Sequence, residues 1–219
     1  QESSEINVVT QTFFGGQSSS VSNDELDKLL PALTITYEFA ESMQVRFGYS
    51  ETLSRPQFRE MSPVLFSNFD TDRQERGFLG LKSSEITNID IRYEWYFGFD
   101  EFLTLSYFNK DFINPIEQVL EASATSSFVS YRNALSAELN GAEFEFQKQF
   151  GELIEGYDFF GKINFTLTDS NAVTNPEFVV LSSYADRPLV GQPDSILNLQ
   201  LGFYGSDDSR FSVVYNDVG

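Results

Sequence analysis

The chain has 219 residues and contains no cysteine and no histidine, which excludes disulfides, thiolate metal sites and any histidine-dependent triad or zinc site. Its formal net charge of −19 argues against nucleic acid as a partner, because a phosphate backbone needs a basic surface. No apolar run reaches the ~18 residues of a transmembrane helix, and the first residues lack the pattern of a signal peptide. We expect neither a cofactor nor a metal.

Apolar and polar residues alternate in many segments, and this period of two predicts an all-β fold of about nine strands. In chain order the predicted strands are residues 6–14 (weakly patterned), 32–40, 43–51, 86–97, 101–112, 141–150, 157–168, 196–204 and 210–216. No segment has a sustained helical period. The pattern therefore indicates a sheet protein.

The stretch NIDIRYEWYF (88–97) shows the alternation most clearly. One parity, from Ile89 to Trp95, is apolar or aromatic, and the other, from Asn88 to Glu94, is polar or charged. A soluble sheet buries the apolar face, whereas an outer-membrane barrel turns it outward against lipid and lines its interior with the polar face. This strand alone is compatible with both.

The lengths of the connections separate these alternatives. Short connections at 40–42, 98–100, 151–156 and 205–209 alternate with long ones at 52–85, 113–136 and 169–194. Long loops without secondary structure are uncommon in soluble domains, whereas up-and-down membrane barrels have short turns at one rim and long loops at the other. The alternation favours a membrane barrel, with the apolar parity facing lipid.

Several segments resemble the C-terminal barrel of TonB-dependent outer-membrane receptors. The most specific are SRPQFREMSP (54–63) and NGAEFEF (140–146). The resemblance runs in the family's order through residues 30–63, 86–117, 138–150, 187–204 and 212–219.

The resemblance implies an antiparallel up-and-down transmembrane β-barrel segment in the cell outer membrane of a Gram-negative bacterium. Residues 1–219 would form a partial barrel domain, with about nine of the roughly 22 strands of the family's barrel. The sequence shows no plug domain and no TonB-contacting segment, and it ends where the family continues through further strands, so we expect a fragment.

The implied function is that of a receptor that imports a scarce solute by active transport, without enzymatic activity. A carbohydrate or oligosaccharide is the favoured solute, and an iron–siderophore comes next. The implied partners are the receptor's own plug domain and remaining barrel strands, the inner-membrane TonB complex, the small-molecule or oligosaccharide ligand, and outer-membrane lipid.

Candidate ligand-binding residues are aromatic and arginine side chains of the long connections, since flat rings suit sugars and siderophores and guanidinium groups bind carboxylates. They are Phe66, Phe69, Arg73, Arg76, Phe128, Tyr131 and Tyr184. Packing between loops and salt bridges with the abundant acids are the alternatives. A second set, on the polar parity, is expected to face the lumen and to contact the plug or the solute: Arg46, Asp90, Arg92, Glu94, Glu143 and Glu145.

Two soluble alternatives remain open. A soluble carbohydrate-binding β-sandwich would bury the apolar parity between two sheets. A hydrolase could use Glu143 and Glu145 as an acid–base pair, because residues two apart on one strand face lie roughly 6–7 Å from each other. A polar lumen wall is the favoured interpretation of this pair, and the connection lengths favour the membrane barrel over both alternatives.

Overall fold

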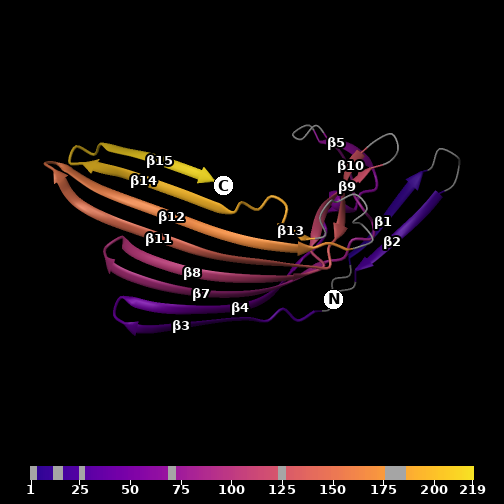
Figure 1. Ribbon diagram of the computed structural model, residues 1–219, viewed down its shortest axis with the longest axis horizontal. Coiled ribbons are helices and arrows are strands. Elements are labelled where there is room, and N and C mark those ends of the chain that lie inside the picture. The colour runs from indigo at the N-terminus through magenta and orange to yellow at the C-terminus, as the bar shows by residue number, and fades with distance from the viewer. Residues whose placement is uncertain (1–3, 12–16, 25–27, 69–72, 123–126, 176–185) are drawn as a thin grey trace.

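The structure, a computed structural model, describes residues 4–11, 17–24, 28–68, 73–122, 127–175 and 186–219. Its main element is a curved antiparallel sheet, here called the wall sheet, whose strands run in the spatial order β15-β14-β12-β11-β8-β7-β4-β3 (Figure 1). The strands are β3 (Ala32–Ala40), β4 (Met43–Ser54), β7 (Ser84–Gly98), β8 (Glu101–Ile113), β11 (Ser136–Ile154), β12 (Tyr157–Val173), β14 (Ser195–Gly205) and β15 (Arg210–Val218). Each wall strand pairs with the wall strands next to it in the chain, so the predicted up-and-down order is confirmed.

The remaining strands are short and lie outside this path. A second sheet, here called the loop sheet, contains β5 (Leu65–Asn68), β6 (Arg73–Arg76), β10 (Ser127–Asn133) and β9 (Ile116–Ala122). The two-residue β13 (Asp186–Arg187) pairs with β12. The weakly patterned strand at 6–14 corresponds to β1 (Ser4–Gln11), which pairs with β2 (Gln17–Asp24) as a separate hairpin rather than joining the wall sheet.

β3 has its predicted bounds, and the other wall strands extend beyond theirs. The longest extensions are in β11 and β12, which continue toward the long connections and pair with each other from Ser136 to Ile154. The short turns gather at one end of the wall sheet, and the long connections gather at the other, where the loop sheet stands (Figure 1). The expectation of long connections without secondary structure is wrong. The connection 52–85 contains β5 and β6, 113–136 contains β9 and β10, and β6 pairs with β10, while 169–194 contains the short β13. One end of the wall sheet therefore has only short turns, and the other carries long connections with secondary structure of their own.

The wall sheet has one apolar and one polar face. On the apolar face, Val45, Tyr93, Leu105, Phe144, Phe165 and Leu197 stand opposite one another across six strands. The stretch from Ile89 to Phe97 is about 26 Å long at ~3.3 Å per residue. This length matches the apolar band of ~25 Å that circles outer-membrane barrels.

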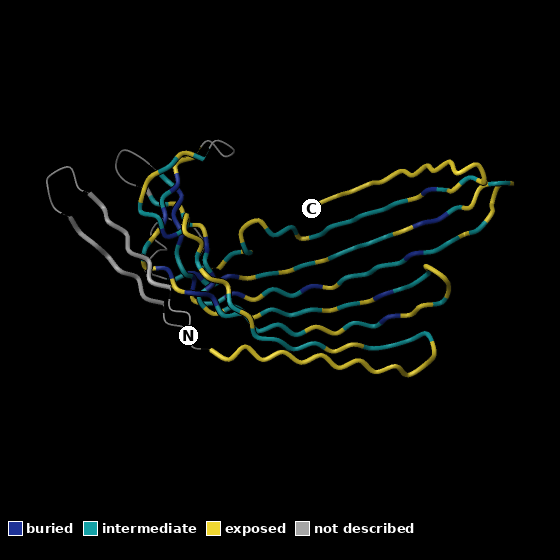
Figure 2. The backbone as a smooth tube through the Cα atoms, turned by 180° about the vertical axis from the view of Figure 1, so that it is seen from behind, coloured by how far each residue is buried: buried dark blue, intermediate teal, exposed yellow. Residues whose placement is uncertain are grey.

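The apolar face is not covered by a second sheet in the described parts of the chain. Leu105 is 49% exposed, Ile91 46% and Leu201 63%, and in Figure 2 most residues of the wall strands are exposed or half-buried, with short buried stretches between them. A β-sandwich would bury these side chains in a core about 10 Å thick between two sheets. The soluble β-sandwich alternative is therefore not supported.

The small core lies instead between the loop sheet and a one-turn helix, α1 (Phe58–Met61). Met61, Leu81 and Tyr131 are buried together there, with Ile116 against them. The Glu60 carboxylate accepts a hydrogen bond of 2.7 Å from the backbone N–H of Gln57 and so stabilises the first turn of the helix. No helix among the described residues is both long and apolar enough to cross a membrane.

Candidate functional site

A row of hydrogen-bonding side chains crosses the polar face of the wall sheet, and we call it the polar row. Strand pairing places its members opposite one another across six strands, and they are Gln44, Glu94, Thr104, Glu145, Asn164 and Asn198. Thr104 is 1% exposed and Glu94 3%, although the sheet stands open to solvent. Their neighbours in the row therefore cover them, and buried polar groups of this kind need partners.

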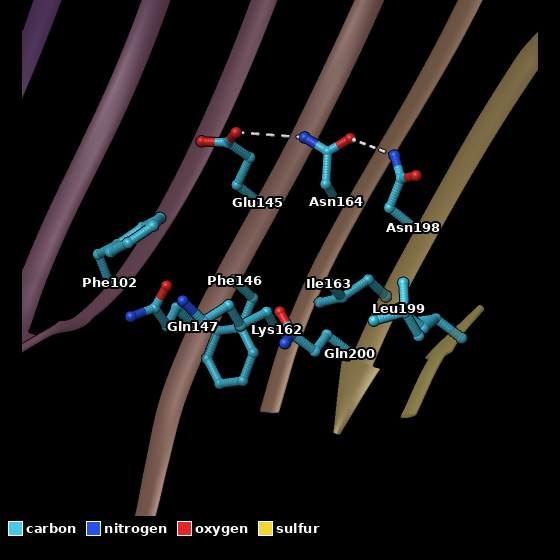
Figure 3. Close-up of a pocket in the computed structure, with 11 residues that line it drawn as sticks. Phe102, Glu145, Phe146, Gln147, Lys162, Ile163, Asn164, Asn198, Leu199 and Gln200 are labelled. Atoms are coloured by element: carbon cyan, nitrogen blue, oxygen red, sulfur yellow. Dashed lines mark hydrogen bonds between the residues drawn. The ribbon is translucent and has the colours of Figure 1, made fainter. Parts of the chain in front are cut away.

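Glu145 is the central acceptor of the polar row. Its Oε2 accepts hydrogen bonds from Arg92 Nη2 at 2.9 Å and Thr104 Oγ1 at 3.1 Å, and its Oε1 accepts one from Asn164 Nδ2 at 3.2 Å. Asn198 Nδ2 donates to Asn164 Oδ1 at 3.3 Å and extends the row to β14. Figure 3 shows Glu145, Asn164 and Asn198 in one line, joined by the last two of these bonds.

Arg92 joins the two carboxylates of the polar row. Its Nε lies 3.0 Å from Glu94 Oε1, while its Nη2 binds Glu145. Glu94 also accepts a hydrogen bond from Gln44 and lies 3.4 Å from Arg46 Nη2. Since two arginines meet two glutamates here, the charges are balanced locally, and a shared guanidinium fixes the geometry of both carboxylates.

A depression of about 220 Å³ lies beside the polar row, between Glu145 and Asn164 on one side and Lys162 and Gln200 on the other (Figure 3). It is lined by amide, ammonium and carboxylate groups together with apolar side chains. Such a surface can accept and donate hydrogen bonds to a chain or solute lying against it. It offers neither enclosure nor a buried reactive group.

The structure brings together four of the six side chains predicted to face the lumen. Arg46, Arg92, Glu94 and Glu145 belong to one network. Asp90 and Glu143 share the same face but stand in other rows, opposite Gly48 and Thr166 respectively. The partners Gln44, Thr104, Asn164 and Asn198 were not among the predicted residues. Gln44, Asn164 and Asn198 stand on a polar parity of their strands, whereas Thr104 shares its parity with Phe102 and Phe108.

The loop sheet contains a second cluster of charged and aromatic side chains. Glu121 forms ion pairs with Arg132 and, at 3.3 Å, with Arg76. The Arg132 guanidinium lies 3.8 Å from the ring centre of Phe78 and that of Arg76 4.4 Å from the ring centre of Phe128. Cations over aromatic faces are stabilised by the ring quadrupole, so each arginine is held between a carboxylate and a ring.

The third long connection is tied to the loop sheet by Arg187. Its Nη2 lies 3.1 Å from Glu117 Oε2 and donates a 2.8 Å hydrogen bond to the Gln118 carbonyl. Burial raises the pKa of the Glu117 carboxyl, and the Arg187 cation opposes this shift. Burial lowers the pKa of Arg132, and the Glu121 carboxylate opposes this shift. In the described part of the chain, Arg187 therefore joins the end of the third long connection to β9.

The predicted ligand-binding residues in the described chain lie in the loop sheet. Phe66 is on β5, where the Arg59 guanidinium lies 4.1 Å from its ring centre, and Arg73 is exposed on β6. Tyr131 is buried in the loop core, and its hydroxyl donates to Glu75 Oε2 at 3.2 Å; burial, and then the Glu75 carboxylate, raise its pKa. Arg76 and Phe128 are stacked, while Phe69 and Tyr184 lie outside the described residues.

The described residues contain no group of three or more carboxylates placed to hold a metal ion. The wall sheet combines an apolar face of membrane height, a hydrogen-bonded polar face and long connections at one rim, which defines the class of outer-membrane β-barrel walls. A family profile described as "TonB dependent receptor-like, beta-barrel" matches residues 4–219. The chain belongs to this family of outer-membrane transporters and receptors, which are not enzymes.

Solved structures show the same fold. A mutant of the ferric enterobactin receptor from Pseudomonas aeruginosa in complex with enterobactin aligns with a TM-score of 0.58 at 18% identity, over 85% of this chain and 27% of that one. The siderophore receptor PirA from Pseudomonas aeruginosa aligns with a TM-score of 0.51 at 14% identity, over 89% of this chain and 35% of that one. The chain thus spans about a third or less of these relatives. No curated protein matches the sequence.

Proposed function

We propose that the chain forms part of the wall and the extracellular loops of an outer-membrane receptor that imports a scarce solute with energy from the TonB complex. The observation that carries this proposal is the division of one sheet into an uncovered apolar face and a hydrogen-bonded polar face on the same strands. Lipid would cover the first face. The receptor's plug domain, or the passing solute, would contact the polar row on the second.

For the solute, we place an iron–siderophore first and a carbohydrate second. The carbohydrate expectation has no independent support, whereas the two solved relatives named above are described as receptors for enterobactin and for siderophores. The guanidinium groups of Arg59 on α1 and Arg76 on β6 lie over the rings of Phe66 and Phe128 in the loop sheet. Guanidinium groups bind flat anionic ligands, while sugars prefer a bare aromatic face.

The test uses the complete receptor that carries these residues, expressed in cells with and without a working TonB complex. We expect uptake of a radio-iron-labelled catecholate siderophore that disappears when TonB is removed. Uptake of a labelled malto-oligosaccharide instead would reverse the order of the two solutes. Uptake of both without TonB would contradict active transport.

A matched pair of arginine variants tests the loop site. Arg76 lies in the loop sheet with its side chain 44% exposed, and Arg210 is exposed at the opposite rim, above Tyr204. We expect Arg76→Ala to weaken siderophore binding by roughly ten-fold, since hydrogen bonds to charged groups contribute about 1.5–3 kcal/mol. Arg210→Ala should leave affinity unchanged. Equal siderophore affinities of the two variants would show that Arg76 does not contribute to siderophore binding.

A further inference from the structure

A groove of about 400 Å³ opens on the apolar face of the wall sheet, over Ala142 of β11. Strand pairing places Ala142 between Tyr107 on β8 and Leu167 on β12, whose side chains are far larger. Phe144 and Phe165, one row nearer the short turns, line its other end. A single methyl group therefore forms the floor of a slot whose walls are long side chains.

The orientation of Tyr107 keeps this floor open. Its hydroxyl donates a 2.9 Å hydrogen bond to Asn140 Oδ1, which lies one row closer to the long connections than Ala142. Tyr107 is 50% exposed, and this bond holds the end of its side chain toward that rim. The shape of the groove therefore depends on the hydrogen bond between Tyr107 and Asn140 as well as on the small side chain of Ala142.

A polar cluster, here called the rim cluster, consists of Asn109, Asn140 and Glu138. It lies next to the Tyr107 end of the groove, on the side of the long connections. Asn109 Nδ2 donates to Asn140 Oδ1 at 2.8 Å and to Glu138 Oε1 at 3.2 Å. Asn140 Nδ2 donates to the same glutamate oxygen at 2.8 Å. These side chains share the apolar parity of their strands, so they face outward just above the lipid-facing band.

We propose that the groove binds one acyl chain of an outer-leaflet glycolipid, with the sugar amide and hydroxyl groups of that lipid against the rim cluster. The apolar face meets hydrocarbon, and the rim cluster lies at the end of the long connections, which is the extracellular side in this class of barrel. Carbonyl, carboxylate and hydroxyl oxygens suit N–H and O–H donors. Glu138 pairs across the strands with Asp111, and these two exposed acids disfavour direct contact with a phosphate.

The acyl chain leaves one hydrocarbon environment for another, so its binding gains little from the hydrophobic effect. Shape contact in the groove and hydrogen bonds at the rim cluster must supply the preference. We therefore expect a selective lipid site of modest strength. It does not depend on which solute the receptor carries.

The experiment uses the complete receptor, extracted in mild detergent and mixed with a hexa-acylated lipid A, with bound lipid counted by native mass spectrometry. The wild type should retain one lipid A molecule. Ala142→Phe fills the groove and should reduce the retained fraction at least five-fold. Leu201→Phe is the control, because Leu201 also faces outward, is 63% exposed and lies closer to the short turns than the groove floor does. This variant should leave retention unchanged.

The remaining outcomes are decisive as well. Equal retention by the two phenylalanine variants, or no retention by the wild type, would overturn the site. If Ala142→Phe fails to fold, Ala142→Leu fills the same space with a smaller side chain. Retention of a phosphatidylethanolamine with the same acyl chains as strongly as lipid A would overturn the assignment to a glycolipid. Asn140→Leu should lower the preference for lipid A over that phospholipid several-fold.

Discussion

Glu145 shows how one side chain can organise a polar surface. It accepts hydrogen bonds from Thr104 and Asn164, on the two strands that flank β11, and from Arg92 on β7, one strand further away. Truncating it leaves a guanidinium, a buried hydroxyl and an amide without their acceptor. Hydrogen-bond partners left unsatisfied in this way cost about 1–3 kcal/mol each when buried, and less where solvent reaches them.

We therefore expect Glu145→Ala to lower the free energy of unfolding of the complete receptor by about 1–3 kcal/mol in total. Glu143→Ala is the matched control, because Glu143 has the same face and strand but stands outside the polar row. The measurement is urea unfolding in detergent, followed by circular dichroism. Equal losses for the two variants would mean that Glu145 has no special place in the sheet.

Gly141 marks a close approach on the polar face. A Cβ atom at this position would overlap Cζ of the Phe108 ring, which lies directly on the glycine. At Gly48, on the same face, a Cβ atom would make an ordinary contact of 3.6 Å with Asp90 Cβ. The two glycines therefore form a natural comparison.

We expect Gly141→Ala to destabilise the receptor by about 1–3 kcal/mol, the usual cost of overpacking. Gly48→Ala should change stability by no more than ~0.5 kcal/mol. Phe108→Ala in the Gly141→Ala background should restore part of the loss if the ring is the cause. Thermal unfolding in detergent compares all three variants, and an equal effect of both glycine substitutions would contradict the steric explanation.

For single residues, the sequence predicted which face of the sheet a side chain occupies better than which side chains it contacts. The alternation put Arg92, Glu94 and Glu145 on one face, and the structure joins them. It did not identify Asn164 or Thr104 as partners, because contact across strands depends on register, which turn geometry sets and the pattern of a single strand does not contain. Tyr131, one of the predicted ligand-binding residues, is buried in the loop core, which the sequence pattern did not predict.

Among the elements, the loop sheet is the largest part of the described fold that the sequence patterns missed, together with β2, β13 and α1. Its strands are four to seven residues long, and β6 pairs with β10 in parallel across a wide sequence separation. Such short runs carry too few alternating positions to be recognised. The wall strands, each with a long alternating stretch, were recognised, but their extensions toward the long connections were not.

The loop sheet should respond to pH through Glu117. Burial raises the folded-state pKa of this carboxyl above its usual 4.5, so the folded state holds the proton more tightly than the unfolded state. Its contribution to stability is complete below the unfolded value and is lost as the pH rises through the folded value. Wild type should therefore lose stability relative to Glu117→Gln between pH 4 and pH 7.

The measurement is the difference in melting temperature between these two forms of the receptor at each pH. Glu117→Gln cannot titrate, and it loses the charged partner of Arg187 at every pH, so only the slope of the difference reports the pKa. A difference that moves in favour of wild type as the pH rises would contradict a raised pKa for Glu117.

For the molecule as a whole, the two faces of the wall sheet predict opposite tolerance to charge. Leu105 pairs with Tyr93 near the middle of the apolar band, and the next residue, Ser106, pairs with Arg92 and Glu143 on the polar face. We expect Leu105→Lys to cost about 2–4 kcal/mol, as a lysine does on the lipid face at the bilayer midplane. Ser106→Lys meets charges of both signs and should be tolerated.

Folding of the two lysine variants into lipid vesicles, followed by urea titration, checks this prediction. Comparable stability would mean that the apolar face does not meet lipid. The 219-residue chain by itself should aggregate in plain buffer and disperse in mild detergent, because its apolar side chains stand uncovered. A sharp monomer peak on size exclusion without detergent would contradict this expectation.

The difference between the two ends of the wall sheet has a consequence for how such a chain can change in length. The turn between β11 and β12 comprises only Glu155 and Gly156, and Gly156 has a φ of +83°, a conformation that few other residues adopt. Inserting or deleting one residue within a wall strand on either side of it would exchange the lipid-facing and polar side chains over the rest of that strand. The long connections carry no such constraint, so gains and losses of sequence should accumulate at the extracellular rim, where new surface can be acquired without disturbing the membrane wall.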